Sequence, residues 1–303
     1  RYQLDVEKVK GLCVFTTHTP VPAGHDTFPV ELVTDVLGDF CSTDNLCRDN
    51  IIGDDNRLNM TYLALFHSEY INGVAQKHGE TSQKMFPEYR IDAITNGVHS
   101  GTWLSDAMAA LLDHHIPNWR KDPYALRNTL SIPRDDIWRA HTASKKELLN
   151  VISEQVGVTL DPDVMTIGFA RRAATYKRAT LLFSRPDRLR QIALDGGGIQ
   201  IIYAGKAHPA DEDGKALIRQ IYQTALEMKG RVKILYLPNY DVYLAKLLVV
   251  GVDLWLNTPL PPMEASGTSG MKAALNGVIN FSVLDGWWIE GHIEGVTGWS
   301  IGS

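Results

Sequence analysis

The second half of the chain alternates short apolar stretches with stretches of helix-forming residues, and this pattern constrains the fold more than any other feature. The apolar stretches carry hydrophobic residues on both faces, which indicates strands buried on both sides. Such strands joined by helices predict a parallel sheet with right-handed crossovers, an α/β doubly wound fold. We expect strands at 165–170, 199–204, 232–237, 252–257 and 278–283, and helices at 180–194, 215–229 and 242–250.

Two turns in the first hundred residues carry polar side chains that suit a binding site. A strand-like stretch near the N-terminus runs into a proline- and glycine-rich turn with His18 and His25, a combination that suits the wall of a pocket. A lone histidine is more often a packed polar residue, so the pair in one stiff turn favours a pocket only modestly. A second strand is expected at 89–94 and enters Asn96-Gly97, which is a turn signal first; an Asn96 that points into a cleft is the alternative.

Two longer stretches are expected to be helical. Apolar residues spaced three and four apart predict one helix over 54–80, on which we interpret His67 and His78 as surface or packing residues. Residues 104–156 are expected to be helical throughout, with breaks at three prolines. The Lys-Lys-Glu run that starts at Lys145 is interpreted as a solvated face.

We expect three parts in this chain: 1–103, 104–162 and 163–303. The middle part is expected to be a helical layer between two lobes. Because the chain begins without a methionine and stops shortly after the richest motif, we expect it to be an internal segment of a longer protein.

Composition excludes several classes of protein. The 303 residues are 44% hydrophobic and 21% charged, which is ordinary for a globular protein. A net charge of −5 argues against a nucleic-acid-binding protein, and no apolar run reaches the length of a membrane span. Three cysteines without a Cys-x-x-Cys spacing favour a reducing compartment, and we expect a cytoplasmic protein. We predict no metal site.

Residues 263–277 concentrate groups that can do chemistry. They follow the strand expected at 252–257 and end in an Asn-Gly helix stop, so their glycines and hydroxyls are expected at a helix N-terminus, where backbone N–H groups attract anions. Glu264 can accept hydrogen bonds from sugar hydroxyls. Lys272, just inside the first helical turn, can hold a phosphate or form a Schiff base. A structural glycine turn with a solvated lysine is the alternative.

A second cluster places four cations in eight residues, directly after the first strand expected in the second half. Loops at this end of parallel strands bind anions in α/β proteins, and arginine suits bidentate contact with phosphate. We predict a phosphate site here, with a solvated basic face as the alternative. The stretches 205–209 and 239–241 are expected at the same edge of the sheet. The four cations are Arg171, Arg172, Lys177 and Arg178.

Together, these motifs resemble those of the α-glucan phosphorylases, which act on glycogen, starch or maltodextrin, and in particular the short bacterial and archaeal type. The match is most specific over Glu264-Ala-Ser-Gly-Thr-Ser-Gly-Met-Lys272 and runs in family order over nearly the whole chain. The resemblance implies two Rossmann-like lobes of the GT-B type, with 1–103 as the end of the N-terminal glucan-binding lobe and 163–303 as an incomplete C-terminal lobe. The other matching motifs are Thr17-His18-Thr19, Thr95-Asn96-Gly97, Arg171-Arg172, Tyr176-Lys177-Arg178, Gly205-Lys206-Ala207 and Tyr240 to Ala245.

The resemblance also implies a cofactor and a role for each motif residue. The cofactor is pyridoxal 5'-phosphate, held covalently as a Schiff base at Lys272. Arg172 and Lys177 would clamp the substrate phosphate and, with His18 and Glu264, are the expected catalytic residues. The cofactor phosphate would be seated by Arg171, Tyr240, Gly267, Thr268 and Ser269. The transferred glucosyl unit would be held by His18, Asn96, Glu264, Ser266 and the amide of Gly267.

The implied reaction is phosphorolysis, catalysed by a glycosyltransferase. Orthophosphate attacks the terminal α-1,4-glucosidic bond of the glucan and releases glucose 1-phosphate with retained anomeric configuration. The cofactor phosphate, whose second pKa lies near 6, would assist proton transfer, and the adjacent cations would stabilise the charge that develops. The resemblance implies no nucleic-acid or membrane partner. It leaves the oligomeric state open, with a homo-oligomer as one possible state.

Two departures from the family pattern and one absence limit the roles that the resemblance implies for the residues of this chain. Ala174-Thr175 replaces the His-Glu pair of the animal and plant enzymes, and Leu260-Pro261 stands where the short type often has arginine. The family's long N-terminal lobe and its closing C-terminal helices are not in this sequence. We therefore expect the 303-residue segment on its own to be inactive, a fragment that folds or binds glucan.

A nucleotide-sugar-dependent glycosyltransferase of the same GT-B architecture is the alternative function. Glu264 would then contact the sugar, and Arg172 and Lys177 would bind a diphosphate. In that case a nucleotide would bind and no Schiff base would form. The context of Lys272 favours the phosphorylase.

Overall fold

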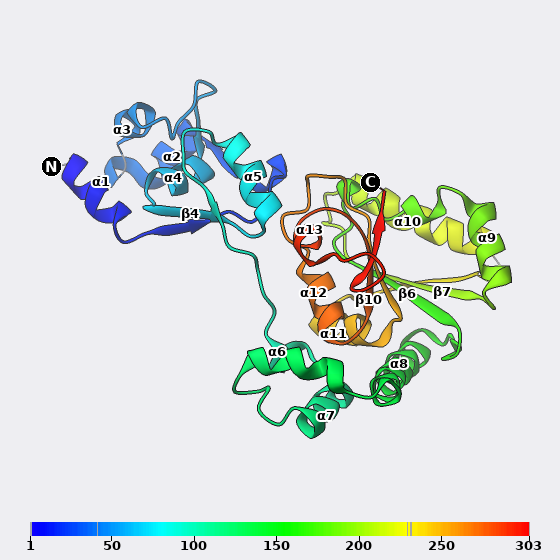
Figure 1. The fold of residues 1–303 in the computed structure, drawn as a ribbon. Helices are drawn as coiled ribbons and strands as arrows, with labels where there is room; N and C mark the ends of the chain where they lie inside the picture. Colours follow the sequence, from blue (N-terminus) through cyan, green and yellow to red (C-terminus); the bar gives the residue numbers. More distant parts are fainter. Residues whose placement is uncertain (1, 41, 229, 231, 303) are drawn as a thin grey trace. The chain divides into compact units, whose positions relative to one another are not determined.

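The computed structural model describes residues 2–40, 42–228, 230 and 232–302 (Figure 1). The chain separates into two compact units. Unit 1 consists of Arg1–Asn96, Pro262–Ser266 and Asp285–Trp287, and unit 2 consists of Gly97–Pro261, Gly267–Leu284 and Trp288–Ser303. The three-part division with boundaries at 103 and 162 stays a prediction.

Unit 1 contains a small parallel sheet in the order β1-β4-β5 and a separate antiparallel pair, β2 with β3. The sheet strands are β1 (Val14–Thr16), β4 (Tyr70–Gly73) and β5 (Asp92–Ala93). The antiparallel pair is β2 (Thr27–Pro29) and β3 (Arg57–Asn59). The helices are α1 (Tyr2–Lys10), α2 (Val30–Leu37), α3 (Thr43–Arg48), α4 (Met60–Phe66) and α5 (Gln76–Met85).

The prediction of one helix over 54–80 is wrong. The segment forms β3, α4, β4 and α5 in turn. Helix α4 begins at Met60 because the side chain of Asn59 accepts hydrogen bonds from the N–H groups of the first turn. Strand β4 forms because Ile71 pairs with Phe15 of β1 and is buried in a small core. The spacing of apolar residues by three and four continues across the end of α4 into β4, so no local pattern indicated the strand.

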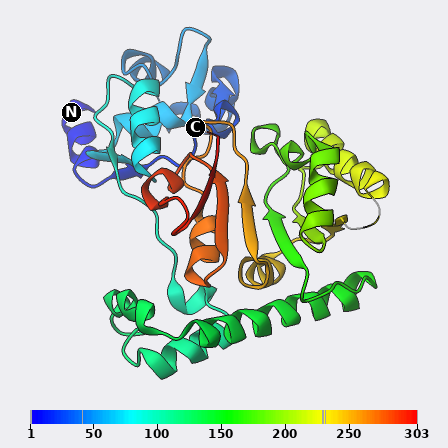
Figure 2. The ribbon, with the colours of Figure 1, turned by 45° about the vertical axis from the view of Figure 1, so that its right-hand side comes forward.

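Unit 2 begins with helices that break at the predicted prolines. They are α6 (Ser100–Trp103), α7 (Asp106–His115), a 3-10 segment (Pro123–Ser131) and the long α8 (Arg134–Val156). Helix α8 is seen along its length in Figure 2 and packs against α7 and α11. The prediction that Lys145 lies on a solvated face is wrong, because this residue is only 4% exposed. Its neighbours Lys146 and Glu147 are exposed, as predicted.

The sheet of unit 2 confirms the predicted α/β fold. All of its described strand pairs are parallel, and the order is β11-β10-β9-β6-β7-β8. The chain runs outward from β6 to β8, returns to the other side of β6, and runs outward again from β9 to β11. This is the strand order of a doubly wound Rossmann sheet. The strands are β6 (Met165–Ala170), β7 (Ile199–Ala204), β8 (Val232–Leu237), β9 (Leu254–Asn257), β10 (Ile279–Val283) and β11 (Gly298–Ile301).

The sheet is covered by helices on both faces, as strands without polar alternation require. Ile202 of β7 belongs to a core shared with α8 and α11, whereas its neighbours Ile201 and Tyr203 belong to a second core shared with α9 and α10. The remaining helices of unit 2 are α9 (Pro186–Asp195), α10 (Glu212–Glu227), α11 (Val242–Gly251), α12 (Thr268–Leu275) and α13 (Trp288–Gly291).

The predicted helix over 180–194 is wrong at its start. Residues 175–177 and 181–183 form two 3-10 turns, and α9 begins at Pro186. Proline suits the first helical position because it lacks the N–H group that has no partner there and its φ is already helical. Helix α10 begins three residues earlier than predicted because the side chain of Asp211 accepts a hydrogen bond from the N–H of Gly214 at 2.9 Å.

Candidate functional site

The loops after β6 and β7 lie together at the carboxyl edge of the unit 2 sheet. The N–H of Arg171 donates to the carbonyl of Ala204 at 3.1 Å, and the N–H of Ala173 donates to the carbonyl of Lys206 at 3.1 Å. Gly205 has a φ of 158°, and a Cβ atom at this position would collide with the carbonyl of Arg171. The close approach of the two loops therefore requires glycine at position 205.

Arg171 and Tyr240, two of the residues predicted to seat a cofactor phosphate, interact electrostatically. Tyr240 follows β8, the third strand of the first half of the sheet. Burial raises the pKa of the Tyr240 phenol, and the positive charge of Arg171 works against that rise. Both side chains are half-buried. The fold thus brings a cation and a phenol from two different loops to the same edge.

The two cations predicted to clamp the substrate phosphate differ in environment. Lys177 is only 7% exposed, and its Nζ lies 4.5 Å from the centroid of the Tyr176 ring. Arg172 is exposed, and its guanidinium makes no hydrogen bond or ion pair with the residues that the structure describes. Lys177 is therefore a fixed charge, whereas the guanidinium of Arg172 is accessible to an anion.

Arg178, the fourth cation of the predicted cluster, connects two loops of the protein. Its Nε donates to the carbonyl of Thr258 at 2.9 Å, and its Nη2 donates to the carbonyl of Pro259 at 2.7 Å. The hydroxyl of Thr258 in turn donates to the carbonyl of Lys177 at 2.8 Å. These bonds tie the loop after β6 to the loop after β9, where the strand order of the sheet reverses. Ligands of doubly wound sheets bind at such a reversal.

Helix α12 begins as the glycine-rich run predicts. Gly267 has a left-handed φ of 86° and precedes Thr268, the first helical residue. The hydroxyl of Ser269 accepts a hydrogen bond from Nε1 of Trp255 at 3.3 Å. Lys272 is the fifth residue of the helix. It therefore lies at the start of the second turn, whereas we expected it in the first turn.

Lys272 lies against an aromatic ring that the sequence did not point to. Its Nζ is 3.6 Å from the centroid of the Trp103 ring, and burial lowers the pKa of the amine. Asn276, four residues further on, donates from Nδ2 to the carbonyls of Trp103 at 2.7 Å and Lys272 at 2.9 Å. Trp103 was missed because it ends a short helix in a stretch where no residue stood out as catalytic. No spacing pattern links it to Lys272.

His18 and His25 in the turn after β1 both act on the charge of His78, which lies on α5. The pKa of His78 is lowered to about 4 by burial first and then by the charge of His18, with a smaller effect of His25. Nδ1 of His78 accepts a hydrogen bond from the N–H of Val74 at 3.1 Å. His78 is therefore a neutral packing residue at neutral pH, as predicted. His18 itself is exposed.

The other predicted residues of unit 1 lie on short connecting segments. Asn96 is half-buried, and its N–H donates to the carbonyl of Val74 at 3.1 Å. The N–H of Glu264 donates to Oδ2 of Asp285 at 2.8 Å, which fixes the backbone of that segment. Ser266 is buried, and its hydroxyl has no hydrogen-bond partner among the described residues. Asp285 was not singled out from the sequence.

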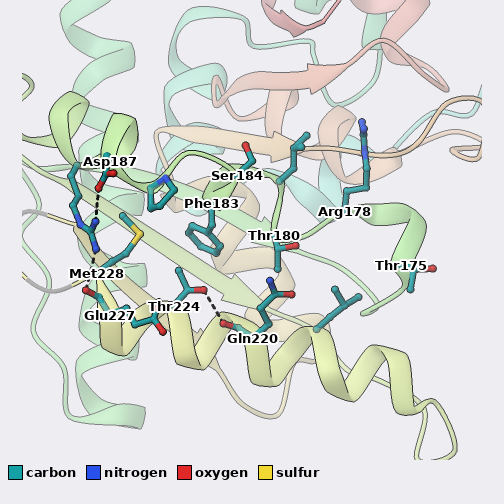
Figure 3. A pocket seen from close by; sticks show the side chains of 14 residues that line it. Thr175, Arg178, Thr180, Phe183, Ser184, Asp187, Gln220, Thr224, Glu227 and Met228 are labelled. Carbon is teal, nitrogen blue, oxygen red and sulfur yellow. Dashed lines mark hydrogen bonds and ion pairs between the residues drawn. The ribbon is translucent and has the colours of Figure 1, made fainter.

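A cavity of about 760 Å³ in unit 2 is lined by Arg178 of the predicted cationic cluster, but by none of the residues expected to contact cofactor or substrate. It lies between residues 175–187 and α10 (Figure 3). Nη1 of Arg190 pairs with Asp187 at 2.8 Å, and its Nη2 donates to the carbonyl of Glu227 at 3.3 Å. The arginines of this cavity are thus bound within the protein, since Arg178 is held by the loop after β9. The cavity is not part of the candidate site.

The described part of the chain offers neither a cluster of metal ligands nor a membrane-spanning helix. It contains no group of three or more histidine, cysteine, aspartate or glutamate side chains that could hold a metal ion. Among its helices, none has the length and apolar character needed to cross a bilayer.

The sequence model of the carbohydrate phosphorylase family matches residues 31–296. The chain therefore belongs to the carbohydrate phosphorylase family. It is 40% identical to a maltodextrin phosphorylase of Thermococcus litoralis, over 97% of this chain and 38% of the relative. It is also similar to glycogen phosphorylases of Aquifex aeolicus (37% identical, over 98% of this chain and 48% of the relative) and Mycobacterium tuberculosis (40%, 97% and 39%). The chain thus spans less than half the length of these relatives.

Proposed function

We propose that the whole protein to which this chain belongs catalyses the phosphorolysis of terminal α-1,4-glucosidic bonds in glycogen, starch or maltodextrin. The products are glucose 1-phosphate and a glucan shortened by one residue. The names of the similar proteins support this class of substrate. The structural observation that carries the proposal is the bond of Arg178 to the loop after β9. It joins the cationic loop to the segment that leads to α12, where the sheet order reverses.

The residues near the start of α12 suit pyridoxal 5'-phosphate. Binding of its aldehyde requires an amine that loses its proton readily, and the pKa of Lys272 is lowered by burial. Its phosphate requires an anion site, which free N–H groups at a helix N-terminus and a nearby cation provide. Gly267 is left-handed there. We assign the covalent bond to Lys272 and the phosphate to Arg171, Tyr240, Gly267, Thr268 and Ser269.

The substrate phosphate is assigned to Arg172 and Lys177. The exposed guanidinium of Arg172 can bind two oxygens of one phosphate at once. The ammonium of Lys177 is buried and cannot swing away, so it supplies a positive charge that needs no reorganisation during the reaction. Together the two cations hold the attacking phosphate and stabilise the charge that it carries.

Five residues are assigned to the glucosyl unit on the family resemblance. His18 and Asn96 would donate or accept hydrogen bonds at its hydroxyls. Glu264 would accept from a hydroxyl with its carboxylate, and its backbone is fixed by Asp285. The buried hydroxyl of Ser266 has no partner among the described residues, which suits a bond to sugar. The fifth contact is assigned to the amide of Gly267.

The bond changes of the reaction are those of a glucosyl transfer. A phosphate oxygen forms a bond to the anomeric carbon, the glucosidic bond breaks, and the leaving O4 oxygen of the glucan takes up the proton that orthophosphate gives up and becomes a hydroxyl. Pyridoxal phosphate, when bound, supplies a phosphate group that can give or accept a proton near neutral pH. We propose that the anomeric configuration is retained, because the resemblance to the family implies it.

The test is the release of glucose 1-phosphate from maltodextrin and orthophosphate by the full-length protein. We expect release to depend on added or retained pyridoxal phosphate and to be absent in Lys272→Ala. Release at the wild-type rate by a Lys272→Ala protein free of the cofactor would contradict the proposal.

A further inference from the structure

Asn276 binds two segments that are far apart in the sequence. It is only 1% exposed, and it closes α12 as the residue after the helix. Nδ2 donates to the carbonyl of Trp103, 173 residues away, at 2.7 Å, and to the carbonyl of Lys272 at 2.9 Å. Oδ1 accepts from the N–H of Ser105 at 2.9 Å. The buried amide of Asn276 therefore pairs with the carbonyl of the residue before Leu104 and with the N–H of the residue after it. It also pairs with one carbonyl of α12.

The residue whose backbone carbonyl this amide binds is also the one whose ring contacts Lys272. The Trp103 ring lies 3.6 Å from Nζ of Lys272. Trp103 also lines a cavity of about 220 Å³ on the same unit, together with Tyr243, Lys246 and Leu247. The ring packs against the core of unit 2 on one side and borders this cavity on another. Two hydrogen bonds of Asn276, to Trp103 and Ser105, attach the backbone of this segment to α12.

We propose that Asn276 is a positioning residue for Lys272, and that it acts by holding the Trp103 ring against the amine. The inference rests on the proposed role of Lys272 in binding pyridoxal phosphate. A ring in this place limits the directions in which the amine can turn and keeps water from one side of it. The amine is then presented to the cofactor aldehyde in one orientation, with little rearrangement on binding.

The ring has two opposing effects on the protonation of the amine. Its face attracts an ammonium group, which favours the charged form, whereas covering the amine removes water and disfavours it. Since the pKa of Lys272 is lowered, with burial as the cause, the second effect is the larger. Helix α12 packs against α6, α11, β9 and β10. Of these elements only α11 carries titratable side chains, the exposed Tyr243 and Lys246.

The test measures the reactivity of Lys272 in the full-length protein after the cofactor has been removed. Acetylation of each lysine is followed by mass spectrometry at a series of pH values, and the midpoint for Lys272 is read from the profile. Accessibility changes the plateau of the profile, but only the protonation of the amine changes the midpoint. We expect Asn276→Ala and Trp103→Leu each to raise the midpoint toward the ordinary lysine value.

The matched control is Asn280→Ala. Asn280 is equally buried, and its Nδ2 donates to the carbonyl of Gly270 in the same helix at 3.0 Å and not to the carbonyl of Trp103. We expect this variant to leave the midpoint unchanged. In a Trp103→Leu background, Asn276→Ala should add no further shift, because the ring through which it acts is gone.

Each outcome decides one of the two proposals. An unchanged midpoint in Asn276→Ala, or an equal shift in Asn280→Ala, would overturn the positioning role and leave the proposed function intact. Full retention of pyridoxal phosphate by Lys272→Ala would overturn the proposed function instead. Should Asn276→Ala fail to fold, Trp103→Leu still tests the positioning role. An unchanged midpoint in that variant would mean that the Trp103 ring does not affect the protonation of Lys272, and it would overturn the proposal.

Discussion

The buried Lys145 and the half-buried Asp253 form an ion pair that joins helix α8 to the start of strand β9. Nζ of Lys145 donates to Oδ2 of Asp253 at 2.6 Å and to the carbonyl of Val164 at 2.9 Å. Oδ1 of the same carboxylate bonds to Nε2 of His141 at 2.8 Å, and Oδ2 also accepts from the N–H of Thr166 at 2.7 Å. The carboxylate therefore fixes α8 against the two central strands, β6 and β9, between which the candidate site lies.

Removal of one member of this pair should destabilise unit 2 strongly. Lys145→Met leaves the half-buried Asp253 carboxylate with fewer donors, and Asp253→Asn leaves a buried ammonium without its counter-charge. We expect either change to lower the free energy of unfolding by about 3–5 kcal/mol. Chemical denaturation of the full-length variants measures this. Lys146→Met, at the exposed neighbouring position, is the control and should change stability by less than about 0.5 kcal/mol.

The same pair predicts how the stability of unit 2 depends on pH. Burial would raise the pKa of Asp253, but the hydrogen bonds from His141, Lys145 and Thr166 outweigh burial and hold it below its ordinary value. The stabilisation is therefore present above the unfolded pKa near 3.9 and is lost as the pH falls through the lower folded value. We expect the protection of amides in β6 and β9 against hydrogen exchange, relative to the intrinsic rate at each pH, to fall below about pH 4. In Asp253→Asn that part of the acid dependence should disappear, and an unchanged profile would contradict the assignment.

The cations after β6 should fall into two groups when the effect of their removal on the KM for phosphate is compared. Arg172→Ala and Lys177→Ala should each raise the KM for phosphate by about tenfold or more, because a charge-assisted bond is worth about 1.5–3 kcal/mol. The KM for maltodextrin should change little. Arg178→Met is the informative comparison, since its guanidinium is bound to Thr258 and Pro259. We expect it to lower stability and to affect the kinetics for both substrates. Equal losses for both substrates in Arg172→Ala would count against the clamp.

Glu264→Gln should chiefly lower the turnover number. Gln is the same size and keeps a carbonyl that can accept a hydrogen bond, but it lacks the charge that strengthens the bond to a sugar hydroxyl in the transition state. The backbone bond of residue 264 to Asp285 should survive the change. We expect kcat for glucose 1-phosphate release to fall about a hundredfold, with a smaller change in KM. A wild-type kcat in this variant would remove the carboxylate from the site.

The sheet of unit 2 could be predicted from the sequence because its strands are apolar on both faces and its helices end at local signals. The left-handed Gly267 and the stop after Leu275 are examples of such signals. Contacts between distant segments left no local signal. Lys145 has the same neighbours in sequence whether it pairs with Asp253 or faces water. Trp103 could not be linked to Lys272 for the same reason, since 169 positions separate them in the numbering.

Prediction also failed where a local pattern was ambiguous. The spacing of apolar residues from Leu58 to Val74 fits a helix, but the same residues supply β3, α4 and β4. Arg178 was counted with the cations of a phosphate site because composition cannot distinguish a guanidinium that binds backbone carbonyls from one that faces solvent. The roles of His18, Asn96 and Glu264 remain predictions.

The central claim is that Lys272 carries pyridoxal phosphate, and borohydride reduction of the full-length protein tests it most directly. Reduction makes the bond between lysine and cofactor permanent, so digestion and mass spectrometry locate the modified residue. We predict a phosphopyridoxyl group on the peptide that contains Lys272 and on no other peptide. A folded protein that carries no such group, or carries it on another lysine, would contradict the account, and tight binding of a nucleotide sugar by that protein would favour the glycosyltransferase instead.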